Sequence, residues 1–153
     1  MPSGQRSPVV IGAGPGRSQP PEMGHFSPQL RLCAMTPGDL HSAVQSAFNN
    51  GDVDSLVDLY EDDAWLFGPS GPVQGTDAIR GVWNELLAMT GSLQMVTQYV
   101  VEKEDMALLS NRWTSTIGDD ELSAVTAEVA RRQSDGTWKY IFDNPDAAGI
   151  LAV

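Results

Sequence analysis

The spacing of apolar residues changes near Gly91, and this change constrains the fold more than any other feature of the chain. Before Gly91, apolar side chains recur three and four residues apart, as in helices with one buried face. After it, apolar and polar residues alternate in segments rich in Val, Thr, Trp and Tyr, as is typical of strands. Helices first and strands afterwards predict an α+β domain whose sheet bends over the helices.

Three helices are predicted before the change of period. The first begins at Thr36, which is a good N-cap and has the capping-box acid Asp39 three positions later. A short second helix begins at Asp52, and a third begins at Thr76. The apolar positions that these helices would bury are, in chain order, Leu40, Ala43, Val44, Ala47, Phe48, Val53, Leu56, Val57, Tyr60, Ile79, Val82, Trp83, Leu86 and Leu87.

The predicted strands begin with a short hairpin, residues 64–67 and 72–74, between the second and third helices. Four longer strands follow Gly91, at residues 93–102, 106–117, 122–133 and 138–144. Short polar turns separate these four strands, and turns of this length join antiparallel neighbours. We therefore expect a cone-shaped, curved antiparallel sheet wrapped around three N-terminal helices, in a domain that spans residues 36–153.

Residues 1–35 are predicted to form a flexible N-terminal appendage, because they are rich in Pro, Gly, Ser and Gln and show no apolar period. Val9 to Gly16 resembles the strand and glycine turn that bind dinucleotides. That motif needs a third glycine where this chain has Arg17, and the prolines that follow cannot open a phosphate-binding helix. We therefore expect no cofactor. Met35, just before the first helix, is a candidate start of translation.

The net charge of −11 is unevenly distributed along the chain. Residues 1–35 carry +2 and the remainder −13, a charge that repels nucleic acid and anionic membranes at long range. The one cysteine, Cys33, cannot form an internal disulfide. No apolar run approaches the roughly 20 residues that span a bilayer. These features predict a cytoplasmic protein that binds neither nucleic acid nor membranes.

Several short motifs occur in a characteristic order: Asn50-Gly51-Asp52, then Leu59 to Ala64, Gly75 to Arg80, Glu128 to Arg132, Asp135 to Trp138 and Asp143 to Pro145. Together with the order of elements, they resemble the SnoaL-like and ketosteroid-isomerase-like proteins of the nuclear transport factor 2-like superfamily. The resemblance covers roughly residues 36–145. It implies a cystatin-like cone with an apolar pocket at its open end, and commonly a homodimer formed through the outer sheet face.

The resemblance also argues against one activity. Ketosteroid isomerases carry their general base as an aspartate directly before a proline, and this chain has Gly68 before Pro69 at that point. A proton shuttle needs a carboxylate within about 3 Å of the carbon acid, which glycine cannot supply. We therefore do not expect an isomerase of this kind.

Glu128 is the candidate catalytic residue. It alternates with small side chains at positions 124, 126 and 130, which would leave room for a cavity on that face of the strand. If this face is the concave one, burial would raise the pKa of Glu128 and suit it to acid–base work or to holding a polar ligand group. The alternative is a structural ion pair with Arg112 or Arg131. The strand period does not decide which face is concave.

Six further residues are candidates for ligand binding: Tyr60, Trp65, Arg112, Trp113, Asp143 and Asn144. We expect Trp113 beside Glu128 in the cone, and Tyr60 and Trp65 nearer its mouth. Asp143 and Asn144 would lie at its rim. The alternative is that the aromatic residues form the core, since each buries about 150–250 Å², and that Asp143 and Asn144 only end the last strand. No His pair has metal-ligand spacing, so no metal is expected.

Two classes of function follow from this pattern. The first is a pocket protein that binds a small apolar or aromatic organic ligand, with a simple proton transfer, cyclisation or hydration as the reaction. The second is a non-catalytic dimerisation or ligand-sensing module. A pocket that holds a polar group favours the first class, and a cone filled by Trp side chains favours the second. Apolar residues on the convex strand face predict a homodimer in either case.

Overall fold

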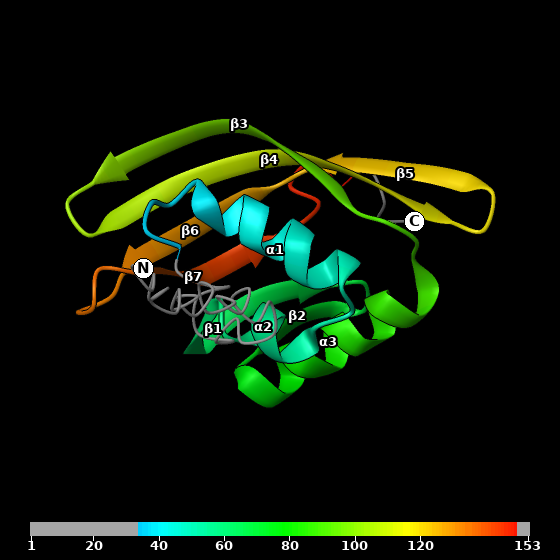
Figure 1. The fold of residues 1–153 in the computed structure, drawn as a ribbon, viewed down its shortest axis with the longest axis horizontal. Coiled ribbons are helices and arrows are strands. Elements are labelled where there is room, and N and C mark those ends of the chain that lie inside the picture. Colours follow the sequence, from blue (N-terminus) through cyan, green and yellow to red (C-terminus); the bar gives the residue numbers. More distant parts are fainter. Residues whose placement is uncertain (1–33, 150–153) are drawn as a thin grey trace, which may run out of the picture.

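The computed structural model describes residues 34–149, which form one curved sheet packed against three helices (Figure 1). In chain order the elements are α1 (Asp39–Asn49), α2 (Val53–Val57), β1 (Tyr60–Gly68), β2 (Gly71–Gln74), α3 (Thr76–Met89), β3 (Gln94–Lys103), β4 (Met106–Ile117), β5 (Asp120–Val125), β6 (Ala127–Arg132) and β7 (Trp138–Asn144). The long strands β3 and β4 arch over α1 in Figure 1. The predicted α+β class is confirmed.

The strand order in the sheet is β2-β1-β7-β6-β4-β3, and β5 also pairs with β4. Strands joined by short turns are antiparallel, as predicted. The exception to the predicted antiparallel sheet is the pair β1 and β7, which run parallel. Most of the domain separates these two strands in the chain, so no tight turn forces them to run in opposite directions, and the sheet is mixed.

The helices begin close to their predicted capping residues. The carboxylate of Asp39 accepts a bond from the Thr36 backbone N–H at 2.9 Å, but α1 itself begins at Asp39, because the residues before it form a tighter turn. The Asp52 side chain caps α2 by accepting from the Ser55 backbone N–H at 3.1 Å. The third helix begins at Thr76, as predicted.

Two predicted elements have different bounds in the structure. Tyr60 was predicted on the buried face of the second helix, but α2 ends at Val57 and Tyr60 begins β1, where it pairs with Tyr140. The single strand predicted over 122–133 is divided into β5 and β6 at Thr126. There the two partners are Ser110 and Asn111 of β4: the Ser110 hydroxyl donates to the Thr126 carbonyl at 2.7 Å, and the Thr126 N–H donates to the Asn111 carbonyl at 2.9 Å.

The apolar core lies between the helices and the inner face of the sheet, and includes Leu40, Leu56, Ile79 and Leu109, all fully buried. Ala34, at the end of the predicted appendage, is also buried, and its carbonyl accepts from the Trp138 N–H at 2.9 Å. The glycine-rich motif and Cys33 lie outside the described residues. Within residues 34–149, no helix is long and apolar enough to cross a membrane.

Candidate functional site

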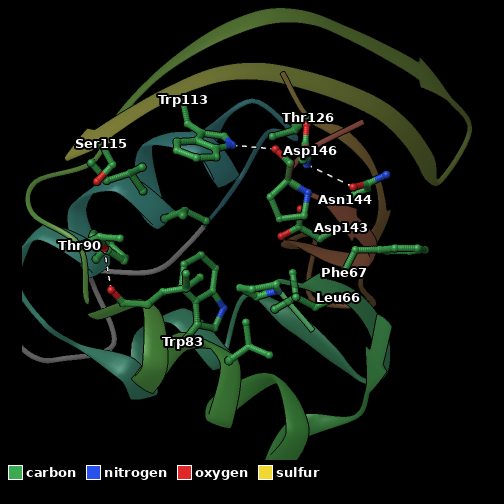
Figure 2. Close-up of a pocket in the computed structure, with 18 of the residues that line it drawn as sticks. Leu66, Phe67, Trp83, Thr90, Trp113, Ser115, Thr126, Asp143, Asn144 and Asp146 are labelled. Carbon is green, nitrogen blue, oxygen red and sulfur yellow. Dashed lines mark hydrogen bonds between the residues drawn. The ribbon is translucent and has the colours of Figure 1, made fainter. Parts of the chain in front are cut away.

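A cavity of about 520 Å³ lies between α3, the inner face of the sheet and the loop after β7 (Figure 2). Most of its wall is apolar, and Trp83 of α3 lies across the cavity from Trp113 of β4. Other apolar lining residues include Val44, Phe48, Leu86, Met95 and Leu122. Polar groups line the end of the cavity formed by β6 and β7: Thr126, Glu128, Tyr140 and Asp143. We call this end the cavity floor.

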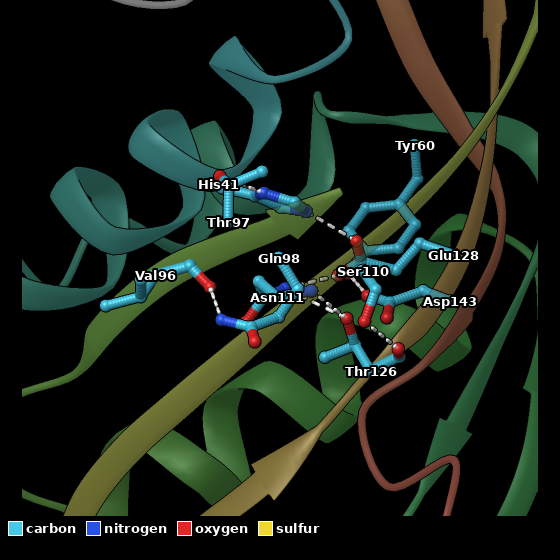
Figure 3. Close-up of polar contacts among 10 residues, drawn as sticks. All are labelled: His41, Tyr60, Val96, Thr97, Gln98, Ser110, Asn111, Thr126, Glu128 and Asp143. Carbon is cyan, nitrogen blue, oxygen red and sulfur yellow. Dashed lines mark hydrogen bonds and ion pairs between the residues drawn. The ribbon is translucent and has the colours of Figure 1, made fainter. Parts of the chain in front are cut away.

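Glu128 lies on β6 with 1% of its surface exposed, and its carboxyl group is held on both oxygens. Its Oε2 lies 2.6 Å from His41 Nε2, and its Oε1 accepts from the Asn111 side-chain N–H at 2.8 Å (Figure 3). The predicted arginine partners are wrong. Arg112 is exposed on the outer face of the sheet, and Arg131 lies 3.5 Å from Glu61. The side chain that faces Glu128 is therefore His41 rather than an arginine.

His41 was not singled out by the sequence analysis, although it is 2% exposed at the centre of this cluster. It follows Leu40 and precedes Val44 by three positions, so the first turns of α1 direct it toward the sheet. Its Nδ1 lies 2.7 Å from the hydroxyl of Thr97 on β3, so both ring nitrogens are engaged. In the sequence, the imidazole of His41 stands beside the apolar stripe of the first helix, and this position alone does not predict which residue it contacts.

Asn111 of β4 is the second side chain that hydrogen-bonds to the carboxyl group of Glu128. It is fully buried, and its side-chain N–H also lies 3.1 Å from the Thr126 hydroxyl. A fully buried Asn must find partners for its amide, and these two contacts supply them for the N–H₂ group. Asn111 lies two positions before Trp113 on β4, so the two side chains are on the same face of the sheet.

Asp143 lies opposite Glu128 on the neighbouring strand β7 and is 6% exposed. The Tyr60 hydroxyl donates to its Oδ2 at 2.5 Å. Burial, and then the negative charge of Glu128, raise the pKa of Asp143 to about 8, although the bond from Tyr60 acts in the opposite direction. Asp143 therefore keeps its proton at neutral pH.

Tyr140 lines the cavity floor, and its hydroxyl has no hydrogen-bond partner within residues 34–149. Burial, and then the negative charges of Glu128 and Asp143, hold the pKa of this phenol well above its ordinary value. Burial, and then the charge of Asp143 and its hydrogen bond with the phenol, raise the pKa of Tyr60, whose ring centre lies 5.3 Å from that of Tyr140. Both phenols therefore remain hydrogen-bond donors, and that of Tyr140 is free to meet a ligand.

Three of the predicted ligand-binding residues line the cavity: Trp113, Asp143 and Asn144. The indole N–H of Trp113 donates to the Pro145 carbonyl at 2.7 Å and so ties the loop after β7 to the cavity wall (Figure 2).

The other three predicted positions differ from the structure. Tyr60 is not at the mouth, because it begins β1 beneath the cavity floor and is 3% exposed. Trp65 is 36% exposed in a hollow of the outer sheet face, since the alternation of β1 turns Ala64 and Leu66 inward. Arg112 faces outward for the same reason, as its neighbour Asn111 is buried. No group of three or more potential metal ligands occurs among the described residues.

The fold is that of one domain family. Residues 41–141 match the model of the SnoaL-like domain, and the chain therefore belongs to the SnoaL-like domain family. This confirms the resemblance seen in the sequence motifs. A search of curated proteins finds no match to the sequence.

Solved structures share the fold. A ketosteroid isomerase-like protein from Erwinia carotovora atroseptica SCRI1043 is 22% identical, with a TM-score of 0.59 over 70% of this chain and 89% of that one. A protein of unknown function with a cystatin-like fold from Nostoc punctiforme PCC 73102 is 17% identical, with a TM-score of 0.61 over 71% and 86%. An NTF2-like protein of unknown function from Pseudomonas putida KT2440 is 22% identical, with a TM-score of 0.60 over 72% and 82%.

Proposed function

We propose that this protein binds a small apolar or aromatic organic molecule in the cavity and catalyses a proton transfer on it, with Glu128 as the base and Asp143 as the acid. One observation carries the proposal: two buried carboxyl groups stand side by side at the floor of an apolar cavity and have different partners. Pairs of acids with contrasting surroundings are a common basis for acid–base catalysis. The SnoaL-like family, a class of small-molecule binding or catalytic domains, supports it.

The contacts of each carboxyl group suit its proposed role. His41 and Asn111 direct nitrogen atoms at Glu128, so its oxygens are arranged as acceptors, as a general base requires. Asp143 holds a proton at neutral pH and can give it, or a hydrogen bond, to a ligand oxygen. The free hydroxyl of Tyr140 can donate to the same oxygen. Charge that develops on that oxygen during the reaction would be stabilised by both donors.

This arrangement fits abstraction of a proton from a carbon next to a carbonyl group. Glu128 would take the proton, and Asp143 and Tyr140 would bind the resulting enolate oxygen. A cyclisation or a hydration can use the same pair of groups. Because Gly68 supplies no carboxylate at the position of the ketosteroid isomerase base, the base would come from β6 instead. A cavity of about 520 Å³ remains between Trp83 and Trp113, which favours a ligand pocket over the alternative of a non-catalytic module.

We also propose a homodimer formed through the outer sheet face. Five apolar residues there are cross-strand neighbours in one continuous row: Val101, Leu108, Val129, Phe142 and Trp65. Four of them are more than a third exposed. A row of this kind across five strands is an association surface on a single sheet. The cytoplasmic location stays a prediction.

The test uses 2-tetralone, a bicyclic aromatic ketone with acidic protons next to its carbonyl group. Binding is followed by quenching of Trp fluorescence, and exchange of the acidic protons in D₂O by proton NMR. We expect saturable binding and exchange well above the buffer rate. Glu128→Gln should still bind the ketone but lose about 100-fold or more of the exchange rate, the usual contribution of a general base. The matched control is Glu102→Gln, an exposed glutamate of β3. Absence of binding, or exchange unchanged in Glu128→Gln, would refute the proposal.

A further inference from the structure

A chain of three side chains connects the cavity floor with the β3 edge of the sheet. The Thr97 hydroxyl lies 2.7 Å from His41 Nδ1, and His41 Nε2 lies 2.6 Å from Glu128 Oε2. Glu128 lines the cavity, His41 is buried outside the cavity lining, and Thr97 is exposed on β3, a strand at the edge of the sheet. Figure 3 shows the imidazole lying between the threonine and the glutamate. Both distances are within hydrogen-bond range.

The backbone of β3 places Thr97 at this point by an irregularity. Thr97 pairs with Asn111 and Tyr99 with Ser110, so Gln98 is an extra residue, a β-bulge. Before the bulge, Thr97 lies on the face that meets α1. After it the alternation is reversed: Tyr99 is exposed and Val100 packs against the core. The bulge therefore gives β3 one inward hydroxyl, opposite His41, and returns the strand to an apolar inner face.

Within residues 34–149, the side chains that hydrogen-bond to Glu128 are His41 and Asn111, and of these two His41 can both accept and donate a proton. Asn111 donates its amide N–H to Oε1 and cannot carry a proton away. Asp143 lies opposite on β7, and its hydrogen-bond partner Tyr60 is 3% exposed, so the contacts on this side lead back into the core. An apolar ligand in the cavity would exclude water from the floor. Under that condition the path through His41 is the one that reaches solvent.

We infer that Thr97 and His41 form a proton path that connects Glu128 with solvent at the β3 edge, separately from the cavity. The inference rests on the proposed role of Glu128 as a base. It makes His41 and Thr97 relay residues, since neither lines the cavity. Proton relays through His depend on its two nitrogens, each of which can hold or release a proton.

Each transfer along the path is balanced. With the imidazole proton on Nε2, the Nε2–H donates to the Glu128 carboxylate and the Thr97 hydroxyl donates to Nδ1. To deliver a proton, water protonates the Thr97 oxygen as the threonine hydroxyl proton passes to Nδ1 and the Nε2 proton passes to Glu128. Glu128 is then protonated, the imidazole is neutral with its proton on Nδ1, and solvent has lost one proton. The reverse sequence returns the proton of Glu128 to solvent and restores the first state. The path therefore lets the base change its protonation state while the cavity is occupied.

The test measures how fast the His41 ring N–H protons exchange with water, by ¹H–¹⁵N NMR on the ligand-free protein. The sequence has two histidines, so His25→Gln identifies the His41 signals. Thr97→Val removes the hydroxyl but keeps the size of the side chain, and should slow the exchange about 10-fold or more. Thr97→Ser restores a hydroxyl and should restore the rate. A purely structural contact predicts the opposite, because its loss would loosen the imidazole and leave the exchange equal or faster.

A second measurement separates this path from exchange through the cavity. With 2-tetralone bound, exchange of the His41 protons should keep its rate if it runs through Thr97. A rate that falls when the ketone binds, or one that Thr97→Val does not slow, would overturn the inference. Failure of 2-tetralone to bind would instead count against the proposed function, because the measurements on the ligand-free protein do not need a ligand.

Discussion

Glu128 and Asp143 stand directly opposite each other on β6 and β7, and both side chains lie inside the domain. Two adjacent buried carboxyl groups cannot both carry a negative charge without a large energetic cost. The structure separates their roles by their partners. Glu128 lies against His41 and Asn111, whereas Asp143 has a phenol as its neighbour and a pKa raised to about 8. Asp143 retains its proton at neutral pH, and Glu128 is the proposed acceptor.

The raised pKa of Asp143 predicts that stability falls as pH rises from about 4 to about 8. In this range the unfolded chain has lost the Asp143 proton, whose ordinary pKa is 3.8, while the folded protein still holds it. The folded state binds the extra proton, so the free energy of unfolding decreases with pH, by up to about 1.4 kcal/mol per pH unit for one group. Above pH about 8 this contribution levels off.

The measurement is urea unfolding between pH 5 and pH 9. Asp143→Asn keeps an oxygen for Tyr60 but cannot ionise, so this variant should gain stability relative to the wild type as the pH rises. Asp105→Asn, in the exposed turn before β4, is the matched control and should follow the wild type. Parallel pH curves for the wild type and Asp143→Asn would show that Asp143 is not protonated in the folded protein.

The contact between His41 and Glu128 predicts strong coupling in stability. His41→Leu leaves Oε2 of the buried Glu128 without the imidazole that contacts it, which should cost about 1–3 kcal/mol, and more where the carboxyl group is charged. The double variant His41→Leu/Glu128→Leu removes both polar groups and should be no less stable than His41→Leu alone. A double-mutant cycle from urea unfolding measures this coupling.

An exposed ion pair provides the control for that cycle. Arg80 and Asp54 lie 2.6 Å apart on the surface, and their side chains are 37% and 81% exposed. Arg80→Met should therefore cost less than about 1 kcal/mol. Additive losses for His41 and Glu128 would mean that the two side chains do not act as a pair.

Local patterns predicted the elements of this fold but not the contacts that make its site. The bounds of β4 and β7 and the start of α3 agree with the apolar periods and capping residues. Tyr60 was misassigned because its spacing from Leu56 and Val57 also fits a helix. The division into β5 and β6 at Thr126 leaves the alternation of buried side chains unchanged on both sides. The apolar period of the sequence therefore could not predict where one strand ends and the next begins.

The cluster around Glu128 depends on how the sheet curves. The strand period correctly grouped Glu128 with Ala124, Thr126 and Ala130, and all four are buried. Which face is concave is set by the packing of α1 against the sheet, and that packing joins His41 to a glutamate 87 positions away. The same ambiguity explains Trp65, whose alternation with Ala64 and Leu66 is regular but whose direction depends on the curvature.

The buried position of Ala34 predicts where a shortened chain loses stability. Ala34 is 1% exposed and accepts a backbone bond from Trp138, whereas Met35 is 59% exposed. A chain that begins at Ala34 should keep its thermal midpoint within a few degrees of the full chain, as expected if residues 1–33 are an appendage. A chain that begins at Thr36 loses the buried methyl group and a backbone bond, and should be less stable by about 1–2 kcal/mol. Calorimetry measures the thermal midpoints of the full chain and the two shortened chains. Equal thermal midpoints for the two shortened chains would contradict this role of Ala34.

The proposed dimer predicts that one charge on the outer sheet face separates the two copies. Phe142 is 48% exposed and lies in the apolar row between Val129 and Trp65. Phe142→Asp would bury a carboxylate in the interface, which should weaken association about 100-fold or more. Light scattering at micromolar concentration should give a dimer mass for the wild type and a monomer mass for this variant. Val96→Asp places the same charge on the outer face of β3 but outside the row, and should remain a dimer. A monomer mass for the wild type would rule out the dimer, and a dimer mass for Phe142→Asp would place the interface elsewhere.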